Sequence, residues 1–146
     1  MGETEIWFRV LNEVGIIDQL ATALFEARLP SPFLVSHFSV LNHLVRVADG
    51  RTPLELARAF QVPKTTMTHT LAGLERGGLV EMRPNPEDRR SKRVWLTEPG
   101  RRFREDAIAS LAPDVARLSQ RFDQARLAAL LPGLEALRRV LDEDRD

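Results

Sequence analysis

The segment 52–78 restricts the fold more than any other, because it predicts two short helices joined by a tight turn. The run Thr52-Pro53-Leu54-Glu55 marks where the first helix, 54–60, begins. A threonine and a glutamate three residues apart cap each other's amides, and proline suits the first helical position. Pro63 follows the end of that helix, and the second helix, 64–76, stops at two glycines. The segment is therefore typical of a helix-turn-helix.

The second of these helices has two different faces. Met67, Leu71 and Leu74 follow an i, i+4, i+7 pattern and predict one buried face. Short polar groups and two cations lie elsewhere on this helix: Lys64, Thr65, Thr66, Thr68, His69 and Arg76. Such side chains suit the reading of base edges and phosphates in the major groove of DNA. An ordinary solvent-facing helix rich in threonine is the alternative, although threonine is a mediocre helix former.

A β-hairpin is predicted next, with strands at 79–83 and 93–97 and a loop at 84–92. Val94 and Leu96 should point inward, and Trp95 outward. The loop carries three cations that could reach phosphates or enter a minor groove, namely Arg89, Arg90 and Lys92. A solvated polar turn is the alternative reading of the same composition.

Long amphipathic helices are predicted on both sides of this segment, at 6–28 and from Thr97 and Asp123 onward. Another helix should begin between residues 31 and 36 and end at Asp49-Gly50. Pro113 should kink or interrupt the helix that contains it, and Pro132-Gly133 should be an irregularity inside the last helix. The predicted fold class is mainly α (α+β), a winged helix-turn-helix with a two-stranded wing.

Charge is unevenly distributed along the chain. Residues 51–104 hold twelve Lys or Arg and six carboxylates, a net charge of +6, whereas residues 1–50 and 105–146 each carry −3. A basic middle segment favours a nucleic-acid partner, but ordinary solvated surface explains the charge alone equally well. The chain has no cysteine, which excludes disulfides, thiolate metal sites and thiol chemistry. With no signal peptide or membrane-spanning run in the sequence, we expect a soluble, cytoplasmic protein.

No combination of residues predicts an enzyme, a cofactor or a metal site. The sequence lacks a nucleophile with a base and an orienting group, a phosphate loop and a metal-ligand spacing of histidines. Satisfied or surface histidines are the expectation for His37, His43 and His69. A small-molecule pocket is a further hypothesis, and its candidate lining is Trp7, Phe33, His37 and Phe38, although core packing is the expectation for at least half of them.

The run from Asp88 to Gly100 resembles the wing signature of the MarR family of bacterial regulators, an Asp-x-Arg tip followed by a strand that ends Leu-Thr-x-x-Gly. The segment from Leu54 to Val80 is similar to the helix-turn-helix of that family. The resemblance covers about residues 52–100. Outside that stretch the resemblance rests on the layout, in which long helices flank the helix-turn-helix and the wing. Pro63 departs from the family pattern, which has a small polar cap there, and predicts a less regular start of the second helix.

The resemblance implies a homodimer whose terminal helices interlock, with each wing touching a minor groove. It gives Arg90 the role of the wing arginine, Asp88 that of its orienting partner and Arg89 that of an extra phosphate contact. It carries the recognition-helix contacts over to a set of five residues: Lys64, Thr65, Thr66, Thr68 and His69. It implies one domain over residues 1–146, with a helical dimerisation region at 1–30 and 105–146 and a DNA-binding region at 36–104.

The predicted function is sequence-specific transcription regulation. We expect a ligand-responsive repressor that binds double-stranded DNA as a homodimer on a palindromic operator, with a small aromatic or phenolic effector. The alternative is a winged-helix module that binds proteins and not DNA. Cations at both the second helix and the wing favour DNA, since a protein-only module needs neither. The apolar stripes of the terminal helices support a dimer, and their alternative role is to cap the core within one chain.

Overall fold

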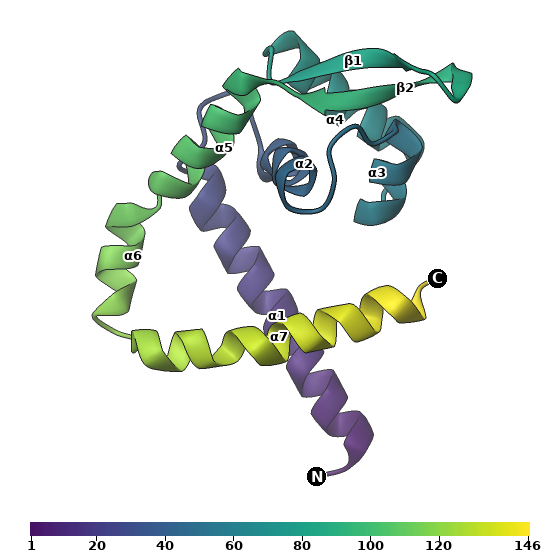
Figure 1. Cartoon of the computed structure of the whole chain (residues 1–146). Helices are drawn as coiled ribbons and strands as arrows, with labels where there is room; N and C mark the ends of the chain where they lie inside the picture. Colours follow the sequence, from purple (N-terminus) through teal and green to yellow (C-terminus); the bar gives the residue numbers. More distant parts are fainter. The chain divides into compact units, whose positions relative to one another are not determined.

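The computed structural model describes all 146 residues, and Figure 1 shows a mainly helical chain with one small antiparallel sheet. Along the chain the elements are α1 (Glu3–Glu26), α2 (Val35–Arg46), α3 (Pro53–Phe60), α4 (Lys64–Arg76), β1 (Val80–Asn85), β2 (Asp88–Leu96), α5 (Glu98–Ala109), α6 (Ala112–Ser119) and α7 (Gln124–Asp144). The predicted fold class is confirmed. The chain forms two compact units, Met1–Ser110 and Leu111–Asp146.

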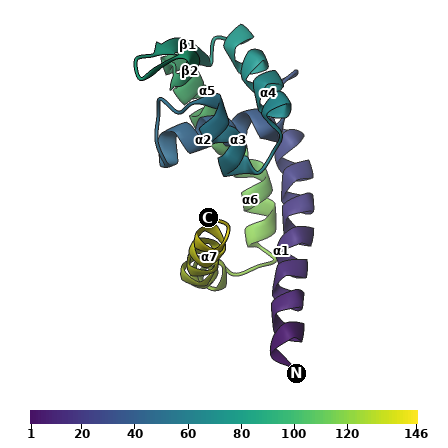
Figure 2. The ribbon, with the colours of Figure 1, turned by 90° about the vertical axis from the view of Figure 1, so that its right-hand side faces the viewer.

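The first unit is a winged helix that continues a long N-terminal helix. Figures 1 and 2 show α2, α3 and α4 gathered beside the β1–β2 hairpin, while α1 runs away from them. No residue of α1 is buried, whereas each of the other three helices contributes side chains to one core. The core also includes the strands, and its members are Val40, Leu41, Leu44, Leu56, Ala57, Met67, Leu71, Leu74, Leu79, Val80 and Val94.

None of the helices combines the length and the hydrophobicity that spanning a bilayer requires.

Three predicted helix starts are confirmed by their caps. The hydroxyl of Thr52 accepts from the amide of Glu55 at 3.2 Å, and the Glu55 carboxylate accepts from the Thr52 amide at 3.1 Å. This hydrogen bond to a backbone amide is the main reason that the pKa of Glu55 is lowered. Thr97 caps α5, and Asp123 caps α7, each by accepting an amide three residues on.

Proline had different effects at its three predicted fault sites. Pro113 does interrupt the helix, since α5 ends at Ala109 and α6 begins at Ala112 with this proline in its first turn. The other two predictions are wrong. Pro132 lies inside an α7 that is continuous, and Pro63 precedes an α4 that starts regularly, with the Met67 amide bonded to the Pro63 carbonyl at 3.1 Å. A proline before the first turn removes no helical hydrogen bond.

The hairpin differs most from its prediction. The loop expected at 84–92 is mostly strand, because β1 extends to Asn85 and β2 begins at Asp88. Alternation of apolar and polar residues is the sequence signal for a strand, and these polar residues carry no such alternation. Val94 is fully buried, as predicted, but Trp95 is only half-exposed because its ring lies against Gly50.

The base of the wing is anchored to the connection between α2 and α3. The Asp49 carboxylate accepts from the Leu96 amide at 2.9 Å, and the Arg51 carbonyl accepts from the Val94 amide at 2.7 Å. Asp49-Gly50 was predicted only to end a helix, so the anchoring role was missed. These two bonds fix where β2 lies relative to the helices.

The end of the wing is joined to the start of α5 around Thr97 and Gly100. The Thr97 hydroxyl donates to the Gly78 carbonyl at 2.7 Å and accepts from the Gly100 amide at 3.1 Å. Gly100 is buried, and a Cβ at this position would collide with the backbone carbonyl of Leu79. The Leu-Thr-x-x-Gly pattern therefore encodes a close backbone approach that only glycine permits.

Gly100→Ala should destabilise the first unit by about 2 kcal/mol, the cost typical of overpacking a tight site. The matched control is Gly15→Ala, which places its new methyl group in open space on α1 and should be neutral or slightly stabilising. Urea unfolding of both variants measures the difference. Equal midpoints for the two would show that the Leu79 carbonyl moves aside freely.

Candidate nucleic-acid interface

Helix α4 turns its apolar side inward and its polar side outward, as predicted. Met67, Leu71 and Leu74 are each no more than 3% exposed. The outward side chains are all exposed: Lys64, Thr65, Thr66, Thr68, His69 and Arg76. Packing of the apolar face against α2 and α3 thus presents one continuous polar surface to solvent.

The threonines of α4 differ in what they can offer a ligand. The hydroxyl of Thr68 donates to the Lys64 carbonyl at 2.9 Å, so only its lone pairs and its methyl group remain available. The hydroxyl of Thr70 is buried and donates to the Thr66 carbonyl at 3.2 Å. Thr65 and Thr66 form no such side-chain bond and keep their donors. The N-terminal turn of α4 therefore presents both donors and acceptors.

The tip of the wing is an ordered ion pair. One carboxylate oxygen of Asp88 accepts from the Arg90 amide at 3.0 Å and from the Arg90 guanidinium at 3.2 Å. The amide bond first, and then the guanidinium bond, lower the pKa of Asp88, so the carboxylate stays ionised. The Arg90 side chain is 92% exposed. Asp88 thus orients a cation that remains almost fully accessible to a ligand.

Asn85 holds the turn between the two strands, a role that sequence reasoning missed. It is 8% exposed, and its amide group donates to Ser91 while its carbonyl oxygen accepts from the Glu87 amide and the Arg93 guanidinium. An asparagine before a proline is a turn signal that could have indicated this. Arg93 also pairs with Glu87 at 3.5 Å, so it stiffens the wing instead of serving as a free cation.

Four exposed cations of this surface have no ion-pair partner: Lys64, Arg76, Arg89 and Lys92. Two lie at the ends of α4, and two lie on β2 beside the Arg90–Asp88 pair. Free cations on both elements form a surface that suits a polyanion.

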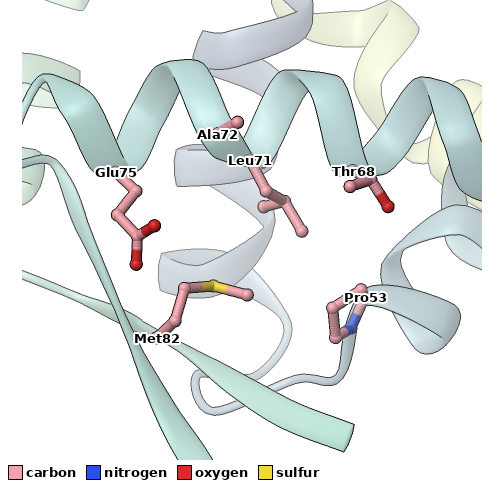
Figure 3. A pocket seen from close by; sticks show the side chains of 6 residues that line it. All are labelled: Pro53, Thr68, Leu71, Ala72, Glu75 and Met82. Atoms are coloured by element: carbon pink, nitrogen blue, oxygen red, sulfur yellow. The ribbon is translucent and has the colours of Figure 1, made fainter.

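A groove of about 150 Å³ lies between α4, the start of α3 and strand β1. Figure 3 shows its lining residues, Pro53, Thr68, Leu71, Ala72, Glu75 and Met82. The walls are mostly apolar, and the one charged group is the carboxylate of Glu75. The groove therefore offers no site for a phosphate, which must bind the cations that lie outside it.

The four pocket candidates do not meet at one place within a protomer. Phe33 and His37 pack edge to face, with ring centroids 5.5 Å apart, whereas Phe38 packs on Phe25 at 4.5 Å. Trp7 lies 18 residues before Phe25 on α1, which is about 27 Å along a helix. Phe33, His37 and Phe38 therefore share the junction of α1 and α2, and Trp7 is remote from it.

The three histidines have different surroundings. His69 is exposed, and His37 accepts a hydrogen bond from the Leu34 amide. His43 is buried beside Phe60, and its Nε2 has no partner, contrary to the expectation that a buried histidine would be satisfied. Burial lowers the pKa of His43, and the charges of Arg51 and Arg46 lower it further. No three His, Asp or Glu side chains gather where they could hold a metal ion.

Comparison with known proteins gives one consistent result. Residues 32–91 match a model of the MarR family. The structure is similar to a crystal structure of a MarR family transcription regulator, with 27% sequence identity, a TM-score of 0.71 and coverage of 97% of this chain and 93% of the other.

Two further solved structures extend the comparison. A mutant MarR from E. coli complexed with operator DNA is 25% identical, with a TM-score of 0.69 and coverage of 94% of this chain and 99% of that one. The transcriptional regulator BldR from Sulfolobus solfataricus shares the fold at 23% identity, with a TM-score of 0.76 and coverage of 98% and 99%.

Proposed function

Because the chain belongs to the MarR family of transcription regulators, we propose that it is a repressor that binds a palindromic operator in double-stranded DNA as a homodimer. One observation carries the proposal: α4 has cations without an ion-pair partner, and the wing has an exposed arginine that a carboxylate orients. The family consists of DNA-binding transcription factors and not of enzymes. A relative of the same fold has been solved with operator DNA, which supports a similar partner here.

In this proposal α4 enters the major groove and the wing reaches the adjacent minor groove. Thr65, Thr66 and His69 offer donors and acceptors to base edges, and Thr68 offers acceptors and a methyl group. Lys64 and Arg76 contact phosphates from the two ends of the helix. Arg90 enters the minor groove in the orientation that Asp88 gives it, with Arg89 and Lys92 on the flanking phosphates.

The homodimer is proposed from the apolar side chains of α1 and α7. Most of the large apolar side chains of both helices are at least two-fifths exposed, among them Ile6, Phe8, Leu11, Ile17 and Leu20 on α1 and Leu127, Leu131, Leu134 and Val140 on α7. Apolar surface of this extent is covered by a partner in stable proteins. A second copy of the chain is the partner that two-fold recognition of DNA requires.

A protein-binding module without DNA is the alternative. A module of that kind has no need of unpaired cations on both α4 and the wing, nor of an arginine tip held outward by a carboxylate. These features favour DNA.

A small-molecule effector is the last part of the proposal. We propose an aromatic or phenolic acid near Phe33, His37 and Phe38, because two ring pairs, Phe33–His37 and Phe25–Phe38, involve the start of α2. Trp7 belongs to this site only if it reaches it from the second protomer. The effector acts by binding more tightly to a form of the dimer in which the distance between the two α4 helices does not fit DNA.

Arg90→Ala should weaken DNA binding and lower the salt slope of the affinity by about one, because one positive charge beside the phosphates that border the minor groove is lost. His69→Ala should change base preference instead. Duplexes selected from random sequence by the wild type, with binding measured over a range of salt, separate the two effects. Arg139→Ala on α7 is the control and should change neither. Unaltered affinity and preference in both test variants would contradict the DNA interface.

The α1 interface predicts an effect of Leu20→Glu on oligomeric state. Leu20 is 68% exposed on the apolar side of α1, and a carboxylate buried there would have no partner. Light scattering should find a dimer for the wild type and monomers or aggregates for Leu20→Glu. Gln19→Glu, which places the same charge about 100° away around the helix, should stay dimeric. A dimer in both variants would place the interface elsewhere.

The absence of cysteine predicts the response to signals. Micromolar peroxide should leave a preformed DNA complex intact, since no thiol is present to oxidise. An aromatic acid that binds should release the DNA, and Phe33→Ala should reduce the release. Fluorescence anisotropy of labelled operator measures both. Release by peroxide in metal-free buffer, with no response to a panel of aromatic acids, would refute this part of the proposal.

A further inference from the structure

Two rings, one from the connection between α1 and α2 and one from the first turn of α2, occupy a notch in the surface of α4. Gly73 lies in α4, and Gly77, the C-cap of that helix, follows four residues later on the same side. A Cβ at Gly73 would stand 2.9 Å from Nε2 of His37, and a Cβ at Gly77 would stand 2.7 Å from Cζ of Phe33. We call these two positions the glycine notch. No residue with a side chain fits there unless a ring moves.

The ring of His37 is held from the other sides as well. Its Nδ1 accepts from the Leu34 amide at 2.9 Å, a bond that closes the start of α2. It packs edge to face with Phe33, and Phe33 in turn packs against Phe103 of α5 at 5.0 Å. Because Nδ1 is an acceptor, the proton of the neutral ring is assigned to Nε2, which faces α4.

The charged groups around His37 are unfavourable to a second proton. His69 and Arg76 face it from α4, and burial together with these two charges lowers its pKa. Phe33 and Phe103 carry no charge. The Glu26 carboxylate lies at the same end of α2, but it accepts from the Val35 amide at 3.0 Å and forms no bond with His37. No anion therefore compensates a protonated ring.

We propose that His37 is a positioning residue for α4 and that it holds this helix in its DNA-binding orientation only while its imidazole is neutral. The inference rests on the proposed DNA binding by α4. A proton on Nδ1 turns the acceptor into a donor that faces the donor amide of Leu34, so the bond that closes α2 is lost. The ring then carries a charge beside Arg76 and leaves the glycine notch, and α4 loses the contact that orients it.

The direction of the pH effect follows from the lowered pKa. The neutral ring dominates above the usual histidine pKa of 6.5, and protonation in the folded protein requires a pH below that value. DNA affinity should therefore be retained near pH 7.5 and lost as the pH falls through the lowered pKa. Protonation breaks the hydrogen bond between Nδ1 of His37 and the Leu34 amide directly. A phosphate of bound DNA would lie on the far side of α4, so its charge reaches His37 only after screening.

The test compares wild type with His37→Asn in binding to a duplex that the wild type selects from random sequence at pH 7.5. Asparagine places an oxygen near the position of Nδ1, so it can accept from Leu34, and it does not titrate. At pH 7.5 His37→Asn should bind less tightly than the wild type, because asparagine lacks the ring that fills the glycine notch. Between pH 7.5 and 5.0 the wild type should lose about tenfold more affinity than His37→Asn, the change expected for one unit of pKa coupling. His69 is present in both proteins, so the comparison isolates the change at residue 37.

A second measurement keeps the inference testable if His37→Asn does not fold. In the free wild-type protein, the NMR shift of the Leu34 amide should titrate together with the His37 ring. Gly73→Ala should weaken DNA binding at pH 7.5 while the protein keeps the oligomeric state of the wild type.

The outcomes are distinct. Parallel pH curves for wild type and His37→Asn, or a Leu34 amide shift that ignores the ring titration, would overturn the role of His37 and leave the proposed function standing. Failure of the wild type to bind any selected duplex at pH 7.5 would overturn the proposed function itself.

Discussion

Burial of the apolar side of α4 is the constraint on which the rest of the first unit depends. Met67, Leu71 and Leu74 lie in the same core as residues of α2, α3 and the hairpin. Because these three side chains are buried, the opposite side of the helix, with its threonines, His69 and Arg76, must face solvent. Core packing thus determines which side of α4 is available to DNA.

The helices could be predicted from the sequence because their signals are local. The Thr52 cap, the Thr97 cap and the break near Pro113 each depend on a few neighbouring residues. The length of the wing could not be predicted, since its outer half is polar on both sides and is held by Asn85 and by strand pairing. The anchoring of β2 by Asp49 is a contact between residues 47 positions apart, and no local pattern reports it.

For the candidate interface, the sequence predicted where the cations lie along the chain but not which of them are free. Arg90 and Arg93 are both wing arginines with an acidic partner, yet one is 92% exposed and the other 29%. The difference arises from Asn85, which draws the Arg93 side chain into the turn. A neutral net charge for the whole chain likewise hides a surface on which unpaired cations are concentrated.

Glycine within a helix is usually judged by its cost to helix stability, and by that measure Gly73 only weakens α4, whereas Gly77 is the C-cap of the helix. In the structure they make room for two rings, Phe33 from the connection after α1 and His37 from the first turn of α2. Helix α1, proposed for the dimer, and helix α4, proposed for DNA recognition, are therefore separated by one short connection and one layer of aromatic contacts. Any change that moves His37 or Phe33, whether a proton or a ligand, acts on α4 directly and does not have to pass through the core.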